Sequence, residues 1–321
     1  MIVVTGAAGF IGSAVMWGLN LRGEHDILAV DTIDHPQKKL NLAPLKYKEL
    51  IDKDTFREQL LAGNYRDIRA IFHLGAISST VEKNWELLDG ANVRYSKDII
   101  AHCVRNDIRI IYASSAAVYG DGSNSYADSE QLFEVLQPLN LYGRSKLVVD
   151  TWARDQGFLS SAVGLRYFNV FGPNEYHKGE MQSVIAKSFP LARARGEIRL
   201  FKSYNPAYAH GEQKRDFVYI KDVVRATLFF LDHPAQNGIF NIGTGVARSW
   251  NDVAHTLFSA LKKRGTISYI DIPEELRRQY QYFTEADISK LRAAGYTDSF
   301  EALEDSITNY VQDYLLGNRH L

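Results

Sequence analysis

A glycine-rich turn between a strand and a helix, at residues 6–12, constrains the fold of this chain more than any other feature. The apolar run at residues 2–4 predicts a buried strand, and apolar residues at helical spacing from 11 to 21 predict a helix. Between them stand Gly6, Gly9 and Gly12. Glycines here let the backbone approach a pyrophosphate, and free N–H groups at a helix start favour negative charge. We interpret the turn as dinucleotide-binding. The alternative is a plain strand-to-helix turn, because the spacing is GxxGxxG and not GxGxxG.

Strand and helix patterns alternate through the first half of the chain. Further apolar runs at residues 27–30, 70–72, 108–112 and 163–168 predict strands, with helical patterns at 92–104 and 142–154. Continuous apolar strands separated by helices favour a parallel sheet that is buried on both faces. We therefore predict a Rossmann-type doubly wound α/β fold with a smaller α/β substrate-binding lobe.

After about residue 171 the pattern becomes mixed, with polar turns and two more strands at 217–220 and 239–242. The remainder is helix-rich, with one β-like run at residues 267–272. This indicates two lobes that exchange chain segments. We predict a cofactor domain of residues 1–171 and 215–243, and a substrate lobe of residues 172–214 and 244–321.

Composition excludes several classes of protein. A single cysteine, Cys103, is incompatible with an internal disulfide framework and fits a reducing compartment. The sequence shows no targeting segment and no apolar run long enough to span a bilayer, so we expect a cytoplasmic protein. A net charge of -1 argues against general nucleic-acid or membrane binding. No histidine or cysteine grouping has the spacing of a metal site, so we expect no metal.

Asp31 ends the second predicted strand, 19 residues after Gly12. An acidic residue there can accept hydrogen bonds from the adenosine ribose and normally favours NAD over NADP. His35, Lys38, Lys39 and Lys53 follow, however, and lysines there can pair with a 2′-phosphate. The alternatives are a turn-capping role for Asp31 and an ordinary solvated face for the lysines, so NAD and NADP both stay open.

Tyr142 and Lys146 are spaced to share one face of a helix. A tyrosine has a reference pKa of about 10, and a neighbouring ammonium lowers it toward the range of a base at neutral pH. Ser114 and Ser115 stand at the end of the fourth strand, where open α/β sheets place their active sites. These residues are candidates for an alcohol-oxidising site, although a Tyr-x-x-x-Lys pair also occurs by chance and either serine can be structural.

In these motifs the chain resembles the extended short-chain dehydrogenases/reductases, which act mostly on nucleotide-activated sugars. The resemblance covers the whole chain. Its later segments are residues 166–173 (RYFNVFGP), 215–223 (RDFVYIKDV) and 241–245 (NIGTG). Where the family's sugar dehydratases carry an Asp-Glu pair, this chain has Ala116 and Ala117. Dehydration is therefore set aside, and epimerisation or reduction remains.

Four further segments, residues 74–80, 177–181, 283–287 and 291–296, are similar to the subgroup that inverts C6 of an ADP-linked heptose for the lipopolysaccharide inner core. This resemblance implies an ADP-heptose substrate, a resident NADP, a transient 6-ketone and a homo-oligomer. It assigns two acid/base roles to Tyr142 and Lys178, with Lys146 tuning Tyr142 and Ser115 orienting the oxygen. Without the resemblance, Lys178 reads as a surface lysine in a polar turn.

The resemblance also assigns binding residues. Those implied for the cofactor are Gly6, Gly9, Phe10, Ile11, Gly12, Asp31, Thr32, Lys38, Lys53, Leu74, Gly75, Ala76, Ile77, Ser78, Asn92, Lys146, Val170 and Lys178. Those implied for the substrate are Asn169, Glu180, Lys187, Phe201, Lys202, Ser203, Tyr204, Arg215 and Tyr280. The chain departs from the subgroup in a longer stretch at residues 205–214 and in Leu74, where an acidic residue is more usual.

Three other functions stay open on sequence alone. One is another nucleotide-sugar epimerase or reductase of the same family, and Lys178 discriminates because a one-base reductase does not need it. A second is a catalytically silent NAD(P)-binding or scaffolding protein, against which the intact Ser115, Tyr142 and Lys146 argue. The third, a single-strand RNA binder, lacks the basic and aromatic stripe that such proteins use.

Overall fold

The computed structural model describes residues 1–277 and 280–321. The strands are β1 (Ile2–Thr5), β2 (Ile27–Val30), β3 (Glu49–Ile51), β4 (Ala70–His73), β5 (Arg109–Ser115), β6 (Ala162–Tyr167), β7 (Asn169–Phe171), β8 (Glu197–Phe201), β9 (Lys214–Tyr219), β10 (Gly238–Ile242), β11 (Ala247–Ser249) and β12 (Thr266–Ile270). The α-helices are α1 (Phe10–Leu21), α2 (Pro36–Leu42), α3 (Lys53–Leu61), α4 (Trp85–Leu88), α5 (Tyr95–Arg105), α6 (Leu141–Asp155), α7 (Val184–Arg195), α8 (Ile220–Asp232), α9 (Trp250–Ala260), α10 (Glu274–Arg277), α11 (Ser289–Ala293) and α12 (Leu303–Asn309). Short 3₁₀ or π-helical segments are η1 (Asp89–Arg94), η2 (Ala116–Tyr119), η3 (Glu130–Val135), η4 (Phe158–Ser160), η5 (Tyr176–Met181) and η6 (Tyr310–Leu315).

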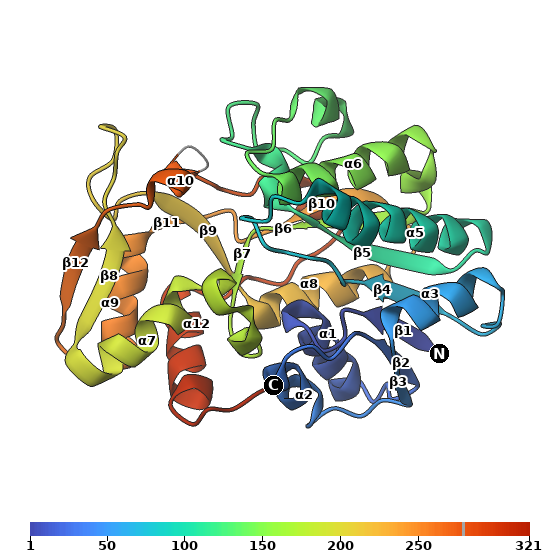
Figure 1. Ribbon diagram of the computed structural model, residues 1–321, viewed down its shortest axis with the longest axis horizontal. Coiled ribbons are helices and arrows are strands. Elements are labelled where there is room, and N and C mark those ends of the chain that lie inside the picture. Colours follow the sequence, from blue (N-terminus) through green and yellow to red (C-terminus); the bar gives the residue numbers. More distant parts are fainter. Residues whose placement is uncertain (278–279) are drawn as a thin grey trace.

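The central sheet has seven strands in the order β10-β6-β5-β4-β1-β2-β3, and every neighbouring pair is parallel. The order reverses direction at β1, as in a doubly wound fold. Helices cover both faces, which confirms the predicted Rossmann-type α/β architecture (Figure 1).

Side-chain alternation along the strands builds a separate core on each face of this sheet. Val4 packs in the cluster that contains α1 and α8, whereas its neighbour Val3 packs in the cluster that contains α3 and α5. Gly18 permits the close crossing of α1 and α8, since a Cβ there would lie 2.3 Å from a methyl group of Val224. The apolar strands therefore fix both layers of helices around one sheet.

Two small sheets lie beyond the central one, on the left of Figure 1. The first has the order β11-β9-β7, and the second pairs β12 with β8 in parallel. The chain passes between the sheets, because β9 leads directly into α8 against α1, and β10 then joins the edge of the central sheet.

The predicted domain boundaries and the homo-oligomer both stay predictions. In the described residues no helix is long and apolar enough to cross a membrane.

Candidate active site

A cavity of about 1210 Å³ opens along the carboxyl ends of the central strands. Its wall includes the glycine turn after β1, Asp31 after β2, residues 74–78 after β4 and Ser115 at the end of β5. Tyr142, Lys146 and Lys178 line the same cavity. Strand ends on this edge are where doubly wound folds bind ligands. The structure therefore brings the predicted cofactor turn and all four predicted catalytic residues to one cavity.

The glycine turn has the shape that a phosphate cradle requires. Gly6 has a φ of +66°, and a Cβ there would lie 2.6 Å from the backbone of Gly75. A Cβ on Gly12 would lie 2.0 Å from the carbonyl oxygen of Gly6. Within the described residues no side chain caps the start of α1 at Gly9, so the helix presents its first N–H groups to the cavity side. A diphosphate fits these features.

Asp31 is held from two sides. Its carboxylate accepts a hydrogen bond from the Ala8 N–H at 2.9 Å. It also forms an ion pair with Lys38 Nζ at 3.2 Å. Lys38 also reaches Asp34 at 2.8 Å. Burial would lower the pKa of Lys38, but its contacts with Asp34 and Asp31 raise it, so the lysine stays charged. Asp31 therefore links the glycine turn to Lys38, and its carboxylate already has two partners.

Most of the other predicted cofactor residues also line the cavity. They are Phe10, Ile11, Thr32, Lys53, Leu74, Gly75, Ala76, Ile77, Ser78 and Val170. Asn92 is fully buried behind this wall and holds it by bonding both the N–H and the carbonyl of Ile77, at 2.8 and 2.9 Å. Leu74, the departure from the subgroup pattern, supplies an apolar side chain to the wall.

The catalytic candidates lie on β5 and α6. Asn140 caps α6 by accepting from the Gly143 N–H at 2.8 Å, which fixes the turn that carries Tyr142. Lys146 Nζ lies 6.0 Å from the centre of the Tyr142 ring and donates to the carbonyl of Ala113 at 2.8 Å. Burial lowers the pKa of Lys146 to about 8, against the opposing charge of Asp150.

The expected effect of Lys146 on Tyr142 needs a correction. Burial of the phenol raises the pKa of Tyr142, and the contact that opposes this is a hydrogen bond to Ser115, not the lysine. The reason is that Lys146 directs its ammonium at the carbonyl of Ala113. Burial therefore opposes ionisation of the Tyr142 hydroxyl, and the hydrogen bond to Ser115 favours it.

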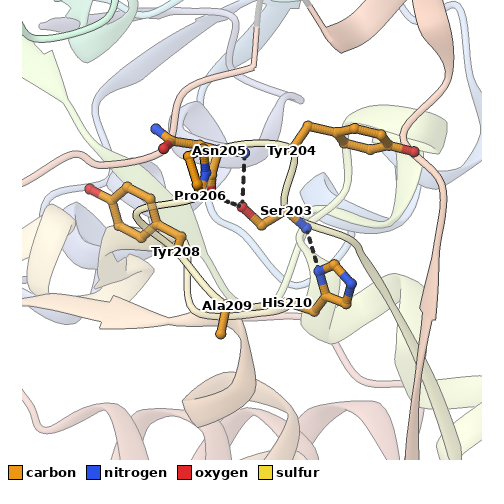
Figure 2. Close-up of a pocket in the computed structure, with 7 residues that line it drawn as sticks. All are labelled: Ser203, Tyr204, Asn205, Pro206, Tyr208, Ala209 and His210. Carbon is orange, nitrogen blue, oxygen red and sulfur yellow. Dashed lines mark hydrogen bonds between the residues drawn. The ribbon is translucent and has the colours of Figure 1, made fainter.

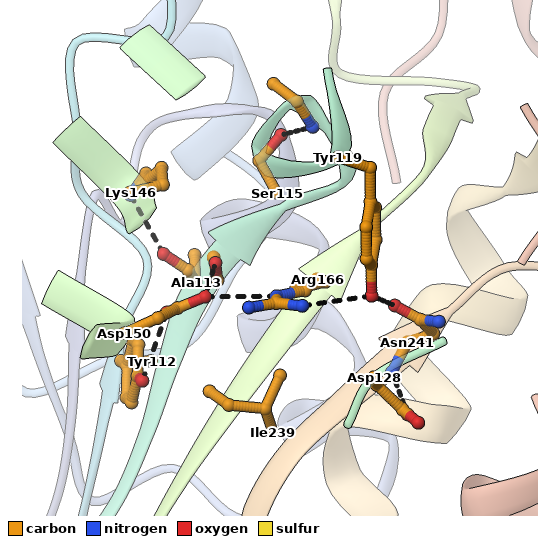
Figure 3. A network of polar contacts seen from close by, with 12 residues as sticks. Tyr112, Ala113, Ser115, Tyr119, Asp128, Lys146, Asp150, Arg166, Ile239 and Asn241 are labelled. Carbon is orange, nitrogen blue, oxygen red and sulfur yellow. Dashed lines mark hydrogen bonds and ion pairs between the residues drawn. The ribbon is translucent and has the colours of Figure 1, made fainter. Parts of the chain in front are cut away.

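A buried polar network that the sequence reasoning missed supports α6 from below (Figure 3). Asp150 lies one turn after Lys146 and forms a fully buried ion pair with Arg166 Nε at 3.0 Å. Ser114 Oγ and Tyr112 OH also donate to Asp150, at 2.8 and 3.2 Å. The network joins α6 to β5 and β6 directly beneath the catalytic candidates. The signal in the sequence was the acid four residues after Lys146, on the same helix face.

Lys178 comes to the cavity from η5, between β7 and α7. Its Nζ lies 5.3 Å from the centre of the Phe10 ring, at the start of α1. Burial lowers the pKa of Lys178, and the charge of Glu175 opposes this effect. The side chain is therefore a half-buried lysine at the cofactor turn and not the fully exposed lysine that its polar neighbours suggest.

The predicted substrate residues divide between two places. Asn169 and Glu180 line the large cavity, and Lys187 pairs with Glu180 at 3.1 Å. Ser203 and Tyr204 line a second, shallow hollow of about 540 Å³ with the longer stretch after them (Figure 2). In that stretch His210 Nδ1 accepts from the Ser203 N–H at 3.0 Å, which folds the loop back on itself.

Arg215 is buried near this second group. Its guanidinium carbon lies 5.4 Å from the centre of the Tyr280 ring and 5.7 Å from that of Trp250, which also lines the large cavity. The Phe201 and Tyr280 rings are 6.3 Å apart. Lys202 pairs with Asp271 at 3.2 Å. The Arg215 guanidinium donates to the carbonyl of Lys214 at 2.8 Å and to that of Gln281, and among the described residues no carboxylate pairs with it. Within residues 1–277 and 280–321, no group of His, Cys, Asp or Glu side chains is arranged to hold a metal ion.

The chain is similar to nucleotide-sugar epimerases in both sequence and structure. The chain is 46% identical over 316 residues to an ADP-L-glycero-D-manno-heptose-6-epimerase of Nitratidesulfovibrio vulgaris, covering 98% of each sequence. A crystal structure of the Helicobacter pylori enzyme of that name matches with a TM-score of 0.80 at 28% identity, covering 97% of this chain and 95% of that one. A UDP-glucuronic acid 4-epimerase variant of Bacillus cereus, solved with a UDP-sugar and NAD, matches with a TM-score of 0.82 at 25% identity over 99% of each chain.

The family model described as "NAD dependent epimerase/dehydratase family" matches residues 2–243. This span includes the glycine turn, Ser115, Tyr142, Lys146 and Lys178. The chain therefore belongs to the NAD dependent epimerase/dehydratase family.

Proposed function

We propose that the protein converts ADP-D-glycero-D-manno-heptose to ADP-L-glycero-D-manno-heptose by inverting C6, with a resident NADP, in the supply of a lipopolysaccharide inner-core precursor. The observation that carries this proposal is the presence of two acid/base groups, Tyr142 and Lys178, in one cavity with the glycine turn. The names of the curated relatives supply the substrate.

The chemistry of an inversion explains why two such groups are needed. A nicotinamide held beside the glycine turn and residues 74–78 would supply the acceptor and donor of hydride for the sugar carbon. One residue removes the C6 hydroxyl proton as the hydride leaves, which gives a 6-ketone. After the sugar end turns over, the hydride returns to the opposite face, and the oxygen now lies elsewhere. A second residue must protonate it there.

The chain's residues can perform these proton transfers from the positions described. Tyr142 presents its hydroxyl at the cavity wall, with Ser115 as its hydrogen-bond partner. Lys146 keeps a positive charge near the Tyr142 ring. Lys178 has a lowered pKa because it is buried, which favours exchange of a proton near neutral pH. The Tyr142 and Lys178 side chains are both half-buried in the wall of the same cavity.

Three residues support NADP over NAD. The carboxylate of Asp31 is already bonded to the Ala8 N–H and paired with Lys38, so its negative charge toward a 2′-phosphate is reduced. Lys53 lines the same cavity, beside Asp54. A phosphate there would gain charge-assisted hydrogen bonds from the lysines.

Lys38→Ala is expected to weaken NADP binding roughly tenfold to a hundredfold, as expected for one lost charged hydrogen bond. Affinity for NAD should change much less, because NAD lacks the 2′-phosphate. Titration calorimetry with both dinucleotides measures the difference. Lys48→Ala, which removes an exposed lysine just before β3, is the control. Equal losses of NAD and NADP affinity in Lys38→Ala would contradict the assignment.

Arg215→Lys is expected to raise the KM for the ADP-sugar roughly tenfold while changing kcat less. The guanidinium fork suits a diphosphate, and lysine keeps the charge but loses the paired donors. Steady-state kinetics separate the two constants, with Arg199→Lys on the exposed side of β8 as the control. An unchanged KM would remove Arg215 from the substrate site.

The direct test of the proposed function is incubation of the purified protein with ADP-D-glycero-D-manno-heptose, with chromatographic resolution of the two C6 epimers. Interconversion to an equilibrium mixture is expected without net consumption of cofactor. A protein that binds NADP and leaves the single epimer unchanged would refute the assignment and favour another nucleotide-sugar substrate of the same family.

A further inference from the structure

The segment that carries Lys178 begins at Gly172, after β7, and ends at Ser183, where α7 starts. Between these ends lies Glu175, which has no exposed surface and does not line the cavity. A buried carboxylate is costly unless its oxygens are satisfied. Glu175 has no part in the proton transfers derived above, so its place in the fold needs another explanation.

Glu175 closes the segment into a loop. Its Oε1 accepts from the Gly172 N–H at 3.2 Å and from Ser183 Oγ at 2.8 Å, and its Oε2 accepts from the Ser183 N–H at 2.5 Å. Burial raises the pKa of Glu175, and the bonds from Ser183 and Gly172 and the charge of Lys178 oppose this effect. All three partners donate, which suits a charged carboxylate better than a protonated acid. One side chain thus bonds both ends of the segment whose middle carries Lys178.

Asn174, next to Glu175, ties the same loop to the cofactor turn. Its φ of +77° is in the left-handed region, which asparagine tolerates better than most residues. Its Nδ2 donates to Ser13 Oγ on α1 at 2.9 Å, and its carbonyl accepts from Asn41 at 3.0 Å. Asn41 also bonds the carbonyl of Ala8 at 3.0 Å. The loop is therefore fixed against the helix that bears Phe10, over which Lys178 lies.

Few other charges face Lys178. His177, beside it, has its pKa lowered to about 4 by burial, with smaller contributions from the charges of Lys38 and Lys178, so it is neutral at pH 7. Lys38 belongs to α2 and is paired with Asp31 and Asp34. Glu180 is exposed and pairs with Lys187. Phe10 on α1 offers a ring and no charge. Glu175 is the acid whose charge raises the pKa of Lys178 against the effect of burial.

We propose that Glu175 is a positioning residue of the reaction, which closes residues 172–183 into a fixed loop and places its buried negative charge next to Lys178. This inference rests on the proposed function, because it assumes that Lys178 transfers a proton. The loop sets where the ammonium stands relative to the sugar oxygen, and the carboxylate stabilises its protonated form.

Glu175→Gln is the main test, since it keeps the size of the side chain, removes the charge and replaces one acceptor oxygen of the loop by an NH2 group. In single turnovers, reduction of the bound cofactor is followed by absorbance with each C6 epimer separately. The epimer whose proton goes to Lys178 should react roughly a hundredfold more slowly, the usual cost of a misplaced group. The epimer whose proton goes to Tyr142 should react at nearly the wild-type rate. Equal slowing with both epimers would mean a merely structural role and would overturn the proposal.

The pH dependence adds a readout that a structural role would not move. In the Lys178-dependent half-reaction the rate rises as Lys178 loses its proton. Loss of the carboxylate lowers the pKa of Lys178, so this acidic limb should move to lower pH by about one unit. Ser183→Ala is the matched control, because it removes one bond of the same loop but leaves the charge of Glu175. The acidic limb of the pH–rate profile should not move in Ser183→Ala. If it does not move in Glu175→Gln either, the proposal is contradicted.

A measurement without substrate separates this inference from the proposed function. Lysines reductively methylated with isotope-labelled methyl groups are titrated by NMR in the holoprotein, with Lys178→Arg used to assign the signal. Glu175→Gln should lower the pKa of the Lys178 signal by about one unit, and Ser183→Ala should leave it within a few tenths. If the wild type fails to interconvert the epimers, the proposed function fails while this titration still decides the role of Glu175. An unchanged Lys178 signal in Glu175→Gln would overturn it.

Discussion

Tyr142→Phe is expected to lower the rate of C6 epimerisation by roughly a thousandfold, within the range that loss of a general acid or base produces. The change removes one hydroxyl from the cavity wall and keeps the ring that packs near Lys146. The cofactor should remain bound, because the glycine turn, Asp31 and the wall at residues 74–78 are untouched. Chromatography of the two epimers measures the rate, and dinucleotide released on denaturation measures retention.

A matched control for this variant is Tyr65→Phe. Tyr65 OH donates to Gln59 at 2.7 Å, and the residue does not line the cavity. Its loss should leave epimerisation unchanged. If Tyr142→Phe kept a rate within tenfold of the wild type, the tyrosine would not be one of the two proton-transfer groups.

Lys178→Met is expected to lower interconversion by a similar factor, roughly a thousandfold. Methionine is close in length to the lysine stem and can keep the contact with Phe10, but it cannot exchange a proton. Because Tyr142 remains, the variant should still reduce its cofactor with one epimer and form the 6-ketone. It should then fail to protonate the oxygen on the other side. Rapid-mixing absorbance and epimer analysis of the same samples measure the two steps.

This result also separates the proposed epimerase from a reductase of the same family. A one-base reductase does not need Lys178, so Lys178→Met would leave its reduction of a ketone nearly unchanged. Lys83→Met, at an exposed position outside the cavity, controls for the loss of a positive charge. Full epimerisation by Lys178→Met would remove the two-base account.

The parts of the fold that were predictable from sequence depend on local patterns. Buried parallel strands are continuous apolar runs, so β1, β2, β4, β5, β6 and β10 were found by inspection. β3, β7, β8 and β11 were missed. β3 has three partly exposed residues, and its strand conformation comes from pairing with β2. β8 alternates buried and charged positions and pairs with β12 from a distant part of the chain.

The site residues also divide into those that a local sequence pattern marks and those whose position depends on the folded structure. Glycine spacing and the interval from Tyr142 to Lys146 are local, so they led to a turn and a helix face that both line the large cavity. The ion pair of Asp150 with Arg166 joins α6 to β6, and although the acid follows Lys146 by four residues, its partner cannot be read from the helix alone. The bonds of Glu175 lie within residues 172–183 but depend on how that segment folds back on itself. The pKa direction of Tyr142 was wrong for a related reason, because burial and the hydrogen bond of Lys146 to Ala113 depend on the packed structure.

The central claim is that hydride leaves C6 and returns to the same carbon on its opposite face. The most direct measurement uses ADP-D-glycero-D-manno-heptose that carries deuterium at C6, incubated with the protein in ordinary water. NMR and mass spectrometry of the L-epimer then locate the label. The account predicts that the product keeps deuterium at C6, because the resident cofactor stores it between the two steps. Replacement of that deuterium by solvent hydrogen would contradict the account and indicate inversion by proton removal and return at carbon.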